Sequence, residues 1–160
     1  MGMVRQNAQS WHIDPDRIGV LGFSAGGYLA AAISTHYDQR LYSQVDAADL
    51  LNCRPDFAML IYPGYLALAD HNFEFNPAIS ITSRVPPTFM IQAQDDPVHV
   101  ENVLDYFVAL KRANVPAELH TYAAGGHGYG LRQTNLPITL WPELAARWLH
   151  TIGVLSGPSA

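Results

Sequence analysis

Short strand-like runs, each followed by turn residues, alternate along the chain with segments of helical periodicity. The runs cover Ile18–Leu21, Phe57–Tyr62, Thr88–Ala93 and Ala117–Tyr122. Apolar runs of this length are typical of strands that are covered on both faces, as in a parallel sheet.

Helical patterns separate these runs. In 101–113, Val103, Phe107 and Leu110 recur at the spacing of one helix face. Three more segments read as helices: the end of a helix at 3–11, a small-residue helix at 27–36 and a last helix at 141–152. Strands that alternate with helices predict βαβ units and a parallel α/β sheet of about four strands.

The other segments are loops. Tyr37–Arg54 is expected to be a surface loop with a short helix. Tyr65–Arg84 has little periodicity and is too short for a sizeable lid domain, which indicates an open site for small substrates. We expect residues 1–160 to form a single domain, with the end of an N-terminal helix in 1–13 and a tail in 154–160.

Composition narrows the function classes. With 49% hydrophobic and 14% charged residues, the chain is globular. The net charge of −5 speaks against nucleic acid or an anionic membrane as a partner. The one cysteine cannot form an internal disulfide. No signal peptide or spanning run is evident, which predicts a cytoplasmic protein as the chain stands. An export signal could have been lost with a missing N-terminal segment.

The segment Gly22-Phe23-Ser24-Ala25-Gly26 lies between the first strand and a helix. A sharp strand-to-helix turn strains its central residue and exposes the side chain, and the flanking glycines are expected because any Cβ would meet neighbouring backbone. Ser24 is therefore a candidate nucleophile for acyl transfer, with the Ala25 N–H as an oxyanion donor. The alternative is an ordinary serine in a strand–turn–helix.

Ser24 has candidate partners at the ends of later strands. Asp95 and Asp96 follow the third strand, and His127 follows the fourth between glycines. Because parallel strands present their carboxyl ends at one edge, these residues should meet and form a triad in the order Ser…Asp…His. Asp96 is favoured because Pro97 biases it towards an extended conformation. Asp95 would then be a solvated or helix-capping carboxylate.

The remaining histidines have structural explanations. His120 should pack within a strand against a helix, and His99 should belong to the helix entry. Surface positions are expected for His12, His36, His71 and His150. No histidine pair has the spacing of a zinc hydrolase, and the glycines at 125–130 lack the βαβ context of a dinucleotide loop. The sequence therefore predicts no metal and no cofactor.

Three motifs together resemble one enzyme family. Segments 14–27, 95–102 and 125–132 look like the elbow, acid and histidine motifs of bacterial α/β-hydrolase esterases. The nearest group is the acetyl-xylan or feruloyl/acetyl esterases, which are related to hormone-sensitive-lipase-like enzymes. This resemblance supports Asp96 as the acid and implies the C-terminal half of an α/β-hydrolase fold. It also implies a truncation, because the family has further strands and a His-Gly-Gly-type oxyanion loop before the elbow.

The expected function is a serine carboxylesterase that acts on small acyl esters, such as acetylated carbohydrates. A feruloyl-type esterase or a small peptidase is the alternative among enzymes. A catalytically weak hydrolase domain with a structural or binding role is the alternative outside them, because Ala25 is the one oxyanion donor that the sequence identifies.

The truncation also predicts an assembly. Without preceding strands, Arg17–Gly22 becomes an apolar sheet edge that lacks protective prolines and charges. We therefore expect a homodimer in which the two elbow strands pair.

Overall fold

A parallel sheet forms the centre of residues 1–156, which the computed structural model describes. Its strands run in the spatial order β1-β2-β5-β6. Their bounds are β1 (Val20–Phe23), β2 (Ala58–Ile61), β5 (Thr88–Ala93) and β6 (Ala117–Tyr122). The expected α/β architecture with a parallel sheet and flanking helices is confirmed.

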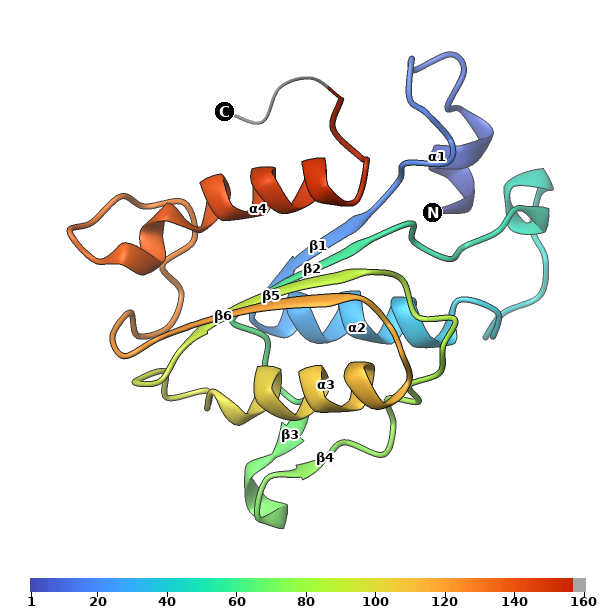
Figure 1. The fold of residues 1–160 in the computed structure, drawn as a ribbon. Coiled ribbons are helices and arrows are strands. Elements are labelled where there is room, and N and C mark those ends of the chain that lie inside the picture. The colour runs from blue at the N-terminus through green and yellow to red at the C-terminus, as the bar shows by residue number, and fades with distance from the viewer. Residues whose placement is uncertain (157–160) are drawn as a thin grey trace.

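Helices cover both faces of this sheet. Helix α4 lies over one face, and α2 and α3 lie side by side over the other (Figure 1). The α-helices are α1 (Gly2–Gln6), α2 (Ala25–His36), α3 (Glu101–Arg112) and α4 (Trp141–Thr151). Because the four strands of the sheet are parallel, they all end at the same edge, where the loops that follow them begin.

Alternate residues of the two central strands face opposite cores. Leu60 and Met90 pack towards α2 and α3, together with Val103 and Leu110. The residues that alternate with them pack towards α4, where the Phe89 ring lies 5.6 Å from the Trp148 ring, centroid to centroid. Burial on both faces explains why β2 and β5 read as continuous apolar runs.

The first strand is displaced from its predicted position. Strands β5 and β6 occupy the predicted residues, whereas β1 begins and ends two residues later than Ile18–Leu21. Ile18 does not join the ladder through its N–H, which donates to Asp56 Oδ2 at 2.8 Å. The ladder instead continues to Phe23, which pairs with Ile61 directly before Ser24.

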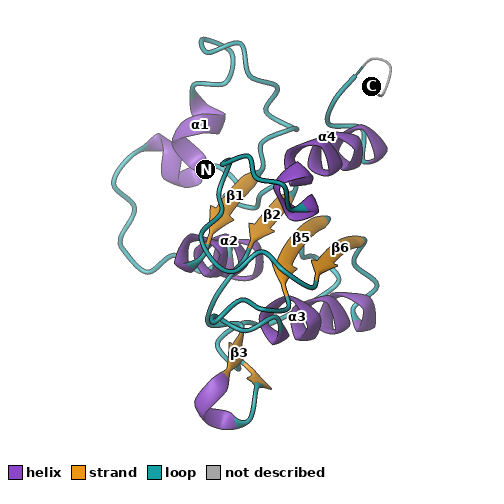
Figure 2. Cartoon of the chain, turned by 90° about the vertical axis from the view of Figure 1, so that its left-hand side faces the viewer, coloured by secondary structure: helices purple, strands orange, loops and turns teal. Residues whose placement is uncertain are grey.

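A small antiparallel pair was missed in Tyr65–Arg84. It comprises β3 (Ala67–Leu68) and β4 (Glu74–Phe75) and lies beyond α3 (Figure 2). Two residues are too few to show the alternation of a strand, so neither strand could be predicted from periodicity. The 3₁₀ helices are η1 (Ala47–Leu50), in the predicted loop, η2 (Ala69–His71) and η3 (Pro137–Leu140).

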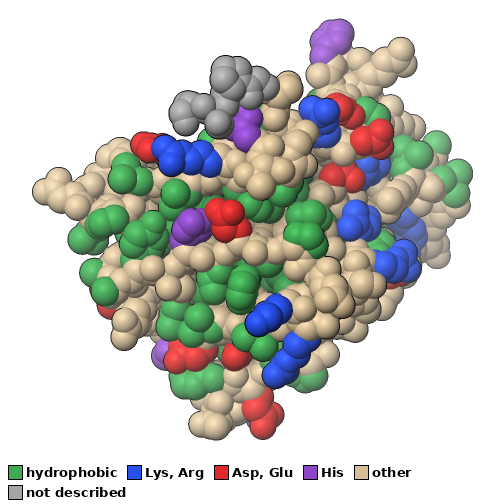
Figure 3. Space-filling view, in the orientation of Figure 1, with side chains coloured by type: hydrophobic (Ala, Val, Ile, Leu, Met, Phe, Trp, Pro, Cys, Tyr) green, Lys and Arg blue, Asp and Glu red, His purple; other side chains and the backbone are tan. Residues whose placement is uncertain are grey.

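Strand β1 forms one edge of the sheet, as expected. Beside it the side chains of Leu21 and Leu29 are 44% and 65% exposed, which leaves an apolar strip uncovered in this chain. The dimer through this edge remains a prediction. On the face shown in Figure 3, charges of both signs are dispersed among hydrophobic side chains.

Within residues 1–156, no helix is both long enough and apolar enough to cross a bilayer. The predicted tail begins with residues that are tied to α4, since the N–H groups of Val154 and Leu155 both donate to the Leu149 carbonyl. Residues 157–160 of that tail lie outside the described part of the chain.

Burial of the Tyr106 phenol predicts that the folded protein loses stability at alkaline pH. Loss of solvation raises the pKa of Tyr106 above its ordinary value, so the folded protein holds this proton more tightly than the unfolded chain. This contribution to stability is complete below about pH 10 and is lost as the pH rises further towards the higher pKa of the folded state. We expect wild type to lose more free energy of unfolding between pH 7 and about pH 11 than Tyr106→Phe, as measured by urea denaturation.

At pH 7 the same variant should lie within about 1 kcal/mol of wild type, because the Tyr106 hydroxyl has no protein partner within residues 1–156. Equal alkaline losses in the two proteins would contradict the assignment.

Candidate active site

Ser24 lies at a strained turn between β1 and α2. Its backbone has φ 53° and ψ −121°, a combination that residues with a side chain rarely adopt. A Cβ added at Gly22 would lie 1.9 Å from the Gly26 carbonyl oxygen, so only glycine permits this close approach. The Ser24 N–H continues the sheet by donating to Ile61 O at 3.1 Å. The turn thus projects the Ser24 side chain from the carboxyl edge of the sheet.

The expectation for the second flanking glycine was wrong. A Cβ at Gly26 would meet nothing within 4 Å. It is the next residue that is crowded, since a Cβ at Gly27 would lie 2.8 Å from Pro63 Cβ, at the end of β2. The tight approach is therefore made by Gly22 on the strand side and by Gly27 on the helix side.

His127 reaches Ser24 from the loop after β6. The distance from Ser24 Oγ to His127 Nε2 is 2.8 Å. The loop turns through Gly126, Gly128 and Gly130, whose positive φ angles of 60°, 74° and 56° are adopted readily by glycine. This explains why the histidine is placed within a glycine-rich segment.

Tyr62 fixes the other side of this loop. Its ring lies edge-on to the His127 ring, with 4.9 Å between centroids. Its hydroxyl accepts a hydrogen bond from the Gly130 N–H at 3.1 Å, while the Gly130 carbonyl accepts from Trp141 Nε1 at 2.8 Å. Burial raises the pKa of Tyr62, which keeps the phenol neutral beside the imidazole.

Asp96 lies behind the imidazole. Both carboxylate oxygens are 3.0 Å from His127 Nδ1, and the carboxylate side chain is fully buried. It also accepts hydrogen bonds from Val98 N at 2.8 Å and from Gln92 Nε2 at 3.1 Å. A buried carboxylate with this many donors is held in one orientation.

The neighbouring carboxylate is exposed, as expected of a solvated group, but it has backbone partners that the sequence did not predict. Asp95 Oδ1 accepts hydrogen bonds from Gly125 N at 2.9 Å and from Gly126 N at 2.7 Å. Asp95 is exposed, but it is neither a free surface carboxylate nor a helix cap. It ties the acid loop to the loop that carries His127.

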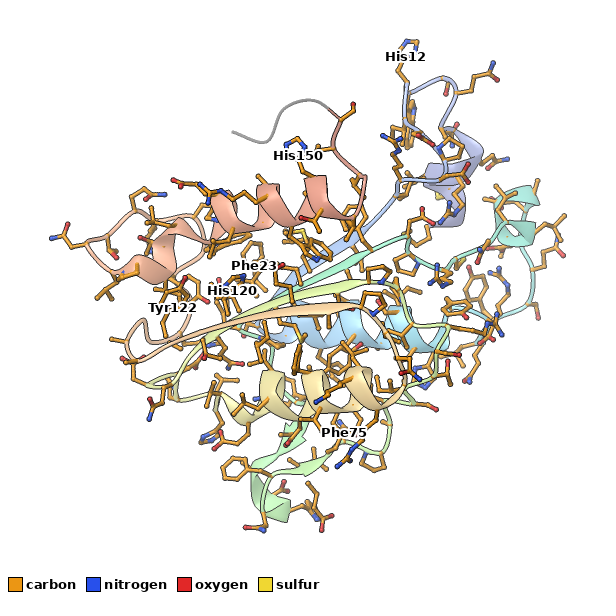
Figure 4. The ribbon with its side chains drawn as sticks, viewed as in Figure 1. His12, Phe23, Phe75, His120, Tyr122 and His150 are labelled. Atoms are coloured by element: carbon orange, nitrogen blue, oxygen red, sulfur yellow. The ribbon has the colours of Figure 1, made fainter. Side chains whose placement is uncertain are left out.

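Sequence reasoning missed Gln92 and Tyr62 as parts of this site. Tyr62 is the last residue of one predicted strand and Gln92 the second-last of another, and an aromatic or polar residue at such a position was the available signal. His120 packs in the sheet as expected, with its ring 5.3 Å from the Phe89 ring, and its Nε2 lies 2.8 Å from Glu118 Oε1. In Figure 4, His12 and His150 point away from the sheet.

The groups around Ser24 suit acyl transfer. Within residues 1–156 no hydrogen-bond acceptor contacts the Ala25 N–H, which opens α2 next to Ser24. That N–H is free to bind an oxyanion. The same part of the chain contains no group of three or more His, Cys, Asp or Glu side chains that could hold a metal ion.

A cavity of about 390 Å³ lies beside Ser24. Its wall includes Tyr65 and Asp70 from the segment around β3, and His99 and Asn102 from the acid loop and α3. A larger hollow of about 830 Å³ at the C-terminal end of α2 contains none of the three residues of the Ser–His–Asp chain. The smaller cavity is thus placed to hold a substrate of Ser24.

Comparison with known families decides the affiliation. The prolyl oligopeptidase family matches residues 2–149. The chain belongs to the prolyl oligopeptidase family. The chain is 30% identical over 152 residues to an acetylxylan esterase of Xylanibacter ruminicola. The match covers 80% of this chain and 29% of that protein. Endo-1,4-beta-xylanase B of Butyrivibrio fibrisolvens is 27% identical over 143 residues, with 78% of this chain and 22% of that protein covered.

Solved structures show the same fold for this prolyl oligopeptidase family member. An acetyl ester-xyloside bifunctional hydrolase from Caldicellulosiruptor lactoaceticus is 36% identical, with a TM-score of 0.85 over 97% of this chain and 64% of that chain. The Est2 esterase of Thermogutta terrifontis is 26% identical, with a TM-score of 0.79 over 99% and 63%. The expected α/β-hydrolase fold is confirmed. The chain spans less than a third of the curated relatives and under two thirds of these structures.

The elbow geometry predicts opposite outcomes at two neighbouring glycines. Gly22→Ala should lower the free energy of unfolding by at least about 2 kcal/mol, because the added methyl group collides with backbone that cannot move aside. Gly26→Ala should stay within about 1 kcal/mol of wild type, because its methyl group enters open space in a helix. Urea denaturation measures both. Similar losses in the two variants would show that the turn is built differently.

Proposed function

We propose that the chain carries the catalytic machinery of a serine carboxylesterase that hydrolyses small acyl esters. The observation that carries the proposal is the continuous chain of hydrogen bonds from Ser24 through His127 to Asp96. Its distances are 2.8 Å at the hydroxyl and 3.0 Å at the carboxylate. These distances support nucleophilic catalysis by a triad.

In the acylation step, Ser24 Oγ attacks the ester carbonyl while His127 Nε2 takes the hydroxyl proton. A C–O bond forms, and the carbonyl electron pair moves onto oxygen. The Ala25 N–H, at the start of α2, stabilises that oxyanion. When the tetrahedral adduct collapses, the bond to the alcohol breaks, and His127 returns its proton to the leaving oxygen.

In the deacylation step, water replaces the alcohol. His127 removes a proton from the water, whose oxygen attacks the acyl carbon of the Ser24 ester. Collapse releases the carboxylic acid and returns a proton to Ser24 Oγ. Throughout both steps the Asp96 carboxylate orients the imidazole and stabilises its protonated form, with no proton transfer to Asp96.

The relatives and the cavity support one substrate class. The relatives include an acetylxylan esterase and an acetyl ester-xyloside bifunctional hydrolase, which supports acetyl esters of carbohydrates as substrates. The cavity beside Ser24 is partly open, and Tyr65 in its wall is 63% exposed. An exposed aromatic ring beside a carboxylate such as Asp70 suits the faces and hydroxyl groups of a sugar.

A small peptidase is the second candidate, favoured by the match to the prolyl oligopeptidase family. The two differ in the leaving group, because an amide requires protonation of a much poorer leaving nitrogen. Parallel assays with p-nitrophenyl acetate and an aminoacyl p-nitroanilide separate them. Faster turnover of the anilide would favour the peptidase.

Acyl-enzyme formation gives the test of the proposal. Wild type should release a burst of p-nitrophenol from p-nitrophenyl acetate, in proportion to the enzyme concentration, followed by slower turnover. Ser24→Ala should show no burst. Ser34→Ala is the matched control, because Ser34 also lies on α2 but bonds to the Ala30 carbonyl. A burst that persists in Ser24→Ala would refute the proposal.

The two neighbouring aspartates should differ in kcat. Asp96→Asn removes the charge behind His127 and favours the wrong imidazole tautomer, so we expect a loss of about 10⁴-fold. Asp95→Asn keeps an oxygen that can accept from Gly125 and Gly126, so its loss should be far smaller. The opposite ranking of the two variants would make Asp95 the acid.

A further inference from the structure

A buried asparagine links two walls of the cavity beside Ser24. Asn102, on the first turn of α3, is 1% exposed. Its Oδ1 accepts hydrogen bonds from Leu66 N at 2.7 Å and from Ala67 N at 3.0 Å. Its Nδ2 donates to Val98 O at 2.6 Å and to His99 O at 2.8 Å. Every hydrogen-bonding position of this amide is therefore occupied by backbone.

The two segments that Asn102 joins have strained backbones next to the bonded atoms. Tyr65, directly before Leu66, has φ 61°, and His99 has φ 73°. Such conformations are unfavourable for residues with a side chain and persist where the surroundings hold them. Tyr65 and His99 both line the cavity that contains Ser24. The amide therefore holds strained residues on two sides of one cavity.

We propose that Asn102 is a positioning residue that sets the width of this cavity and so determines which esters fit against Ser24. The inference rests on the proposed esterase function and adds the residue that controls its selectivity. Asn102 borders the cavity but is only 1% exposed, so its role is not to bind the substrate. It acts through the backbone at the start of β3 and of the acid loop, because one rigid amide fixes the separation of both.

The variant Asn102→Asp separates the two halves of this link. It keeps an oxygen for the amides of Leu66 and Ala67, but places a second oxygen against the carbonyls of Val98 and His99. The acid loop then loses its tie while the size of the side chain is conserved. Asn102→Ser, which brings no charge into the interior, removes most of the link and serves if the aspartate variant does not fold.

The ratio of kcat/KM between two substrates distinguishes a change in the cavity from a general loss of structure. Partial unfolding lowers the active fraction and reduces turnover of all substrates by the same factor. A wider cavity changes the ratio between substrates of different size. We expect the ratio to shift by about fivefold or more towards the larger ester, mainly through KM.

Ser24 is part of the cavity lining, so the cavity can hold either the acyl group or the alcohol of the ester. Two series of substrates are therefore needed. The acyl series compares p-nitrophenyl acetate with p-nitrophenyl butyrate. The alcohol series compares p-nitrophenyl acetate with 4-methylumbelliferyl acetate. A shift in one series supports the inference and identifies the part of the ester that the cavity holds.

The matched control is Asn114→Asp, the same chemical change in an exposed residue just beyond the other end of α3. Its ratios should equal those of wild type. Hydrogen exchange of wild type adds a reading that needs no variant, since the amides of Leu66 and Ala67 should be strongly protected. Rapid exchange at both would overturn the inference.

Failure of the inference and failure of the proposed function have different signatures. Unchanged ratios in both series, in an Asn102 variant that is folded and active, overturn the role of Asn102 and leave the esterase intact. A wild-type protein without a burst or turnover overturns the esterase itself, and the role of Asn102 in selectivity with it.

Discussion

The backbone of β1 approaches the start of α2 so closely at Gly22 that a single methyl group there would lie 1.9 Å from the Gly26 carbonyl oxygen. The rest of the site depends on this contact. It forces Ser24 into its strained conformation, directs the hydroxyl away from the sheet and leaves the Ala25 N–H free at the helix start. The strain is sustained by the ladder on one side, where Phe23 pairs with Ile61, and by the helix on the other.

The acid loop and the first turn of α3 organise the remainder of the site through three polar side chains. Asp95 binds the glycine loop after β6, Asp96 binds the imidazole that this loop carries, and Asn102 binds the start of β3. Each side chain satisfies buried or strained backbone, so the loops after separate strands hold one another in place. This is why a catalytic geometry can rest on loops, which by themselves are the mobile parts of a fold.

The sequence predicted the features that repeat or that have strong local causes. Burial on both faces made β5 readable, and Ser24 and His127 stood out because glycines mark sharp turns. Features that depend on distant partners could not be read. In the sequence, Gln92 is one polar residue in an apolar strand. Its role depends on Asp96, whose Oδ2 lies 3.1 Å from Gln92 Nε2 in the fold. The β3–β4 pair has too few residues for periodicity and depends on Asn102 for its position.

In the proposed mechanism, the strained turn, the start of α2 and the imidazole of His127 together make Ser24 the nucleophile. The most direct test of this mechanism is reaction with a fluorophosphonate, followed by peptide mass mapping of wild type and of His127→Ala. We expect one adduct on wild type, located on Ser24, and a rate of labelling reduced by orders of magnitude in His127→Ala. An adduct on another serine, or equal labelling of the two proteins, would contradict it.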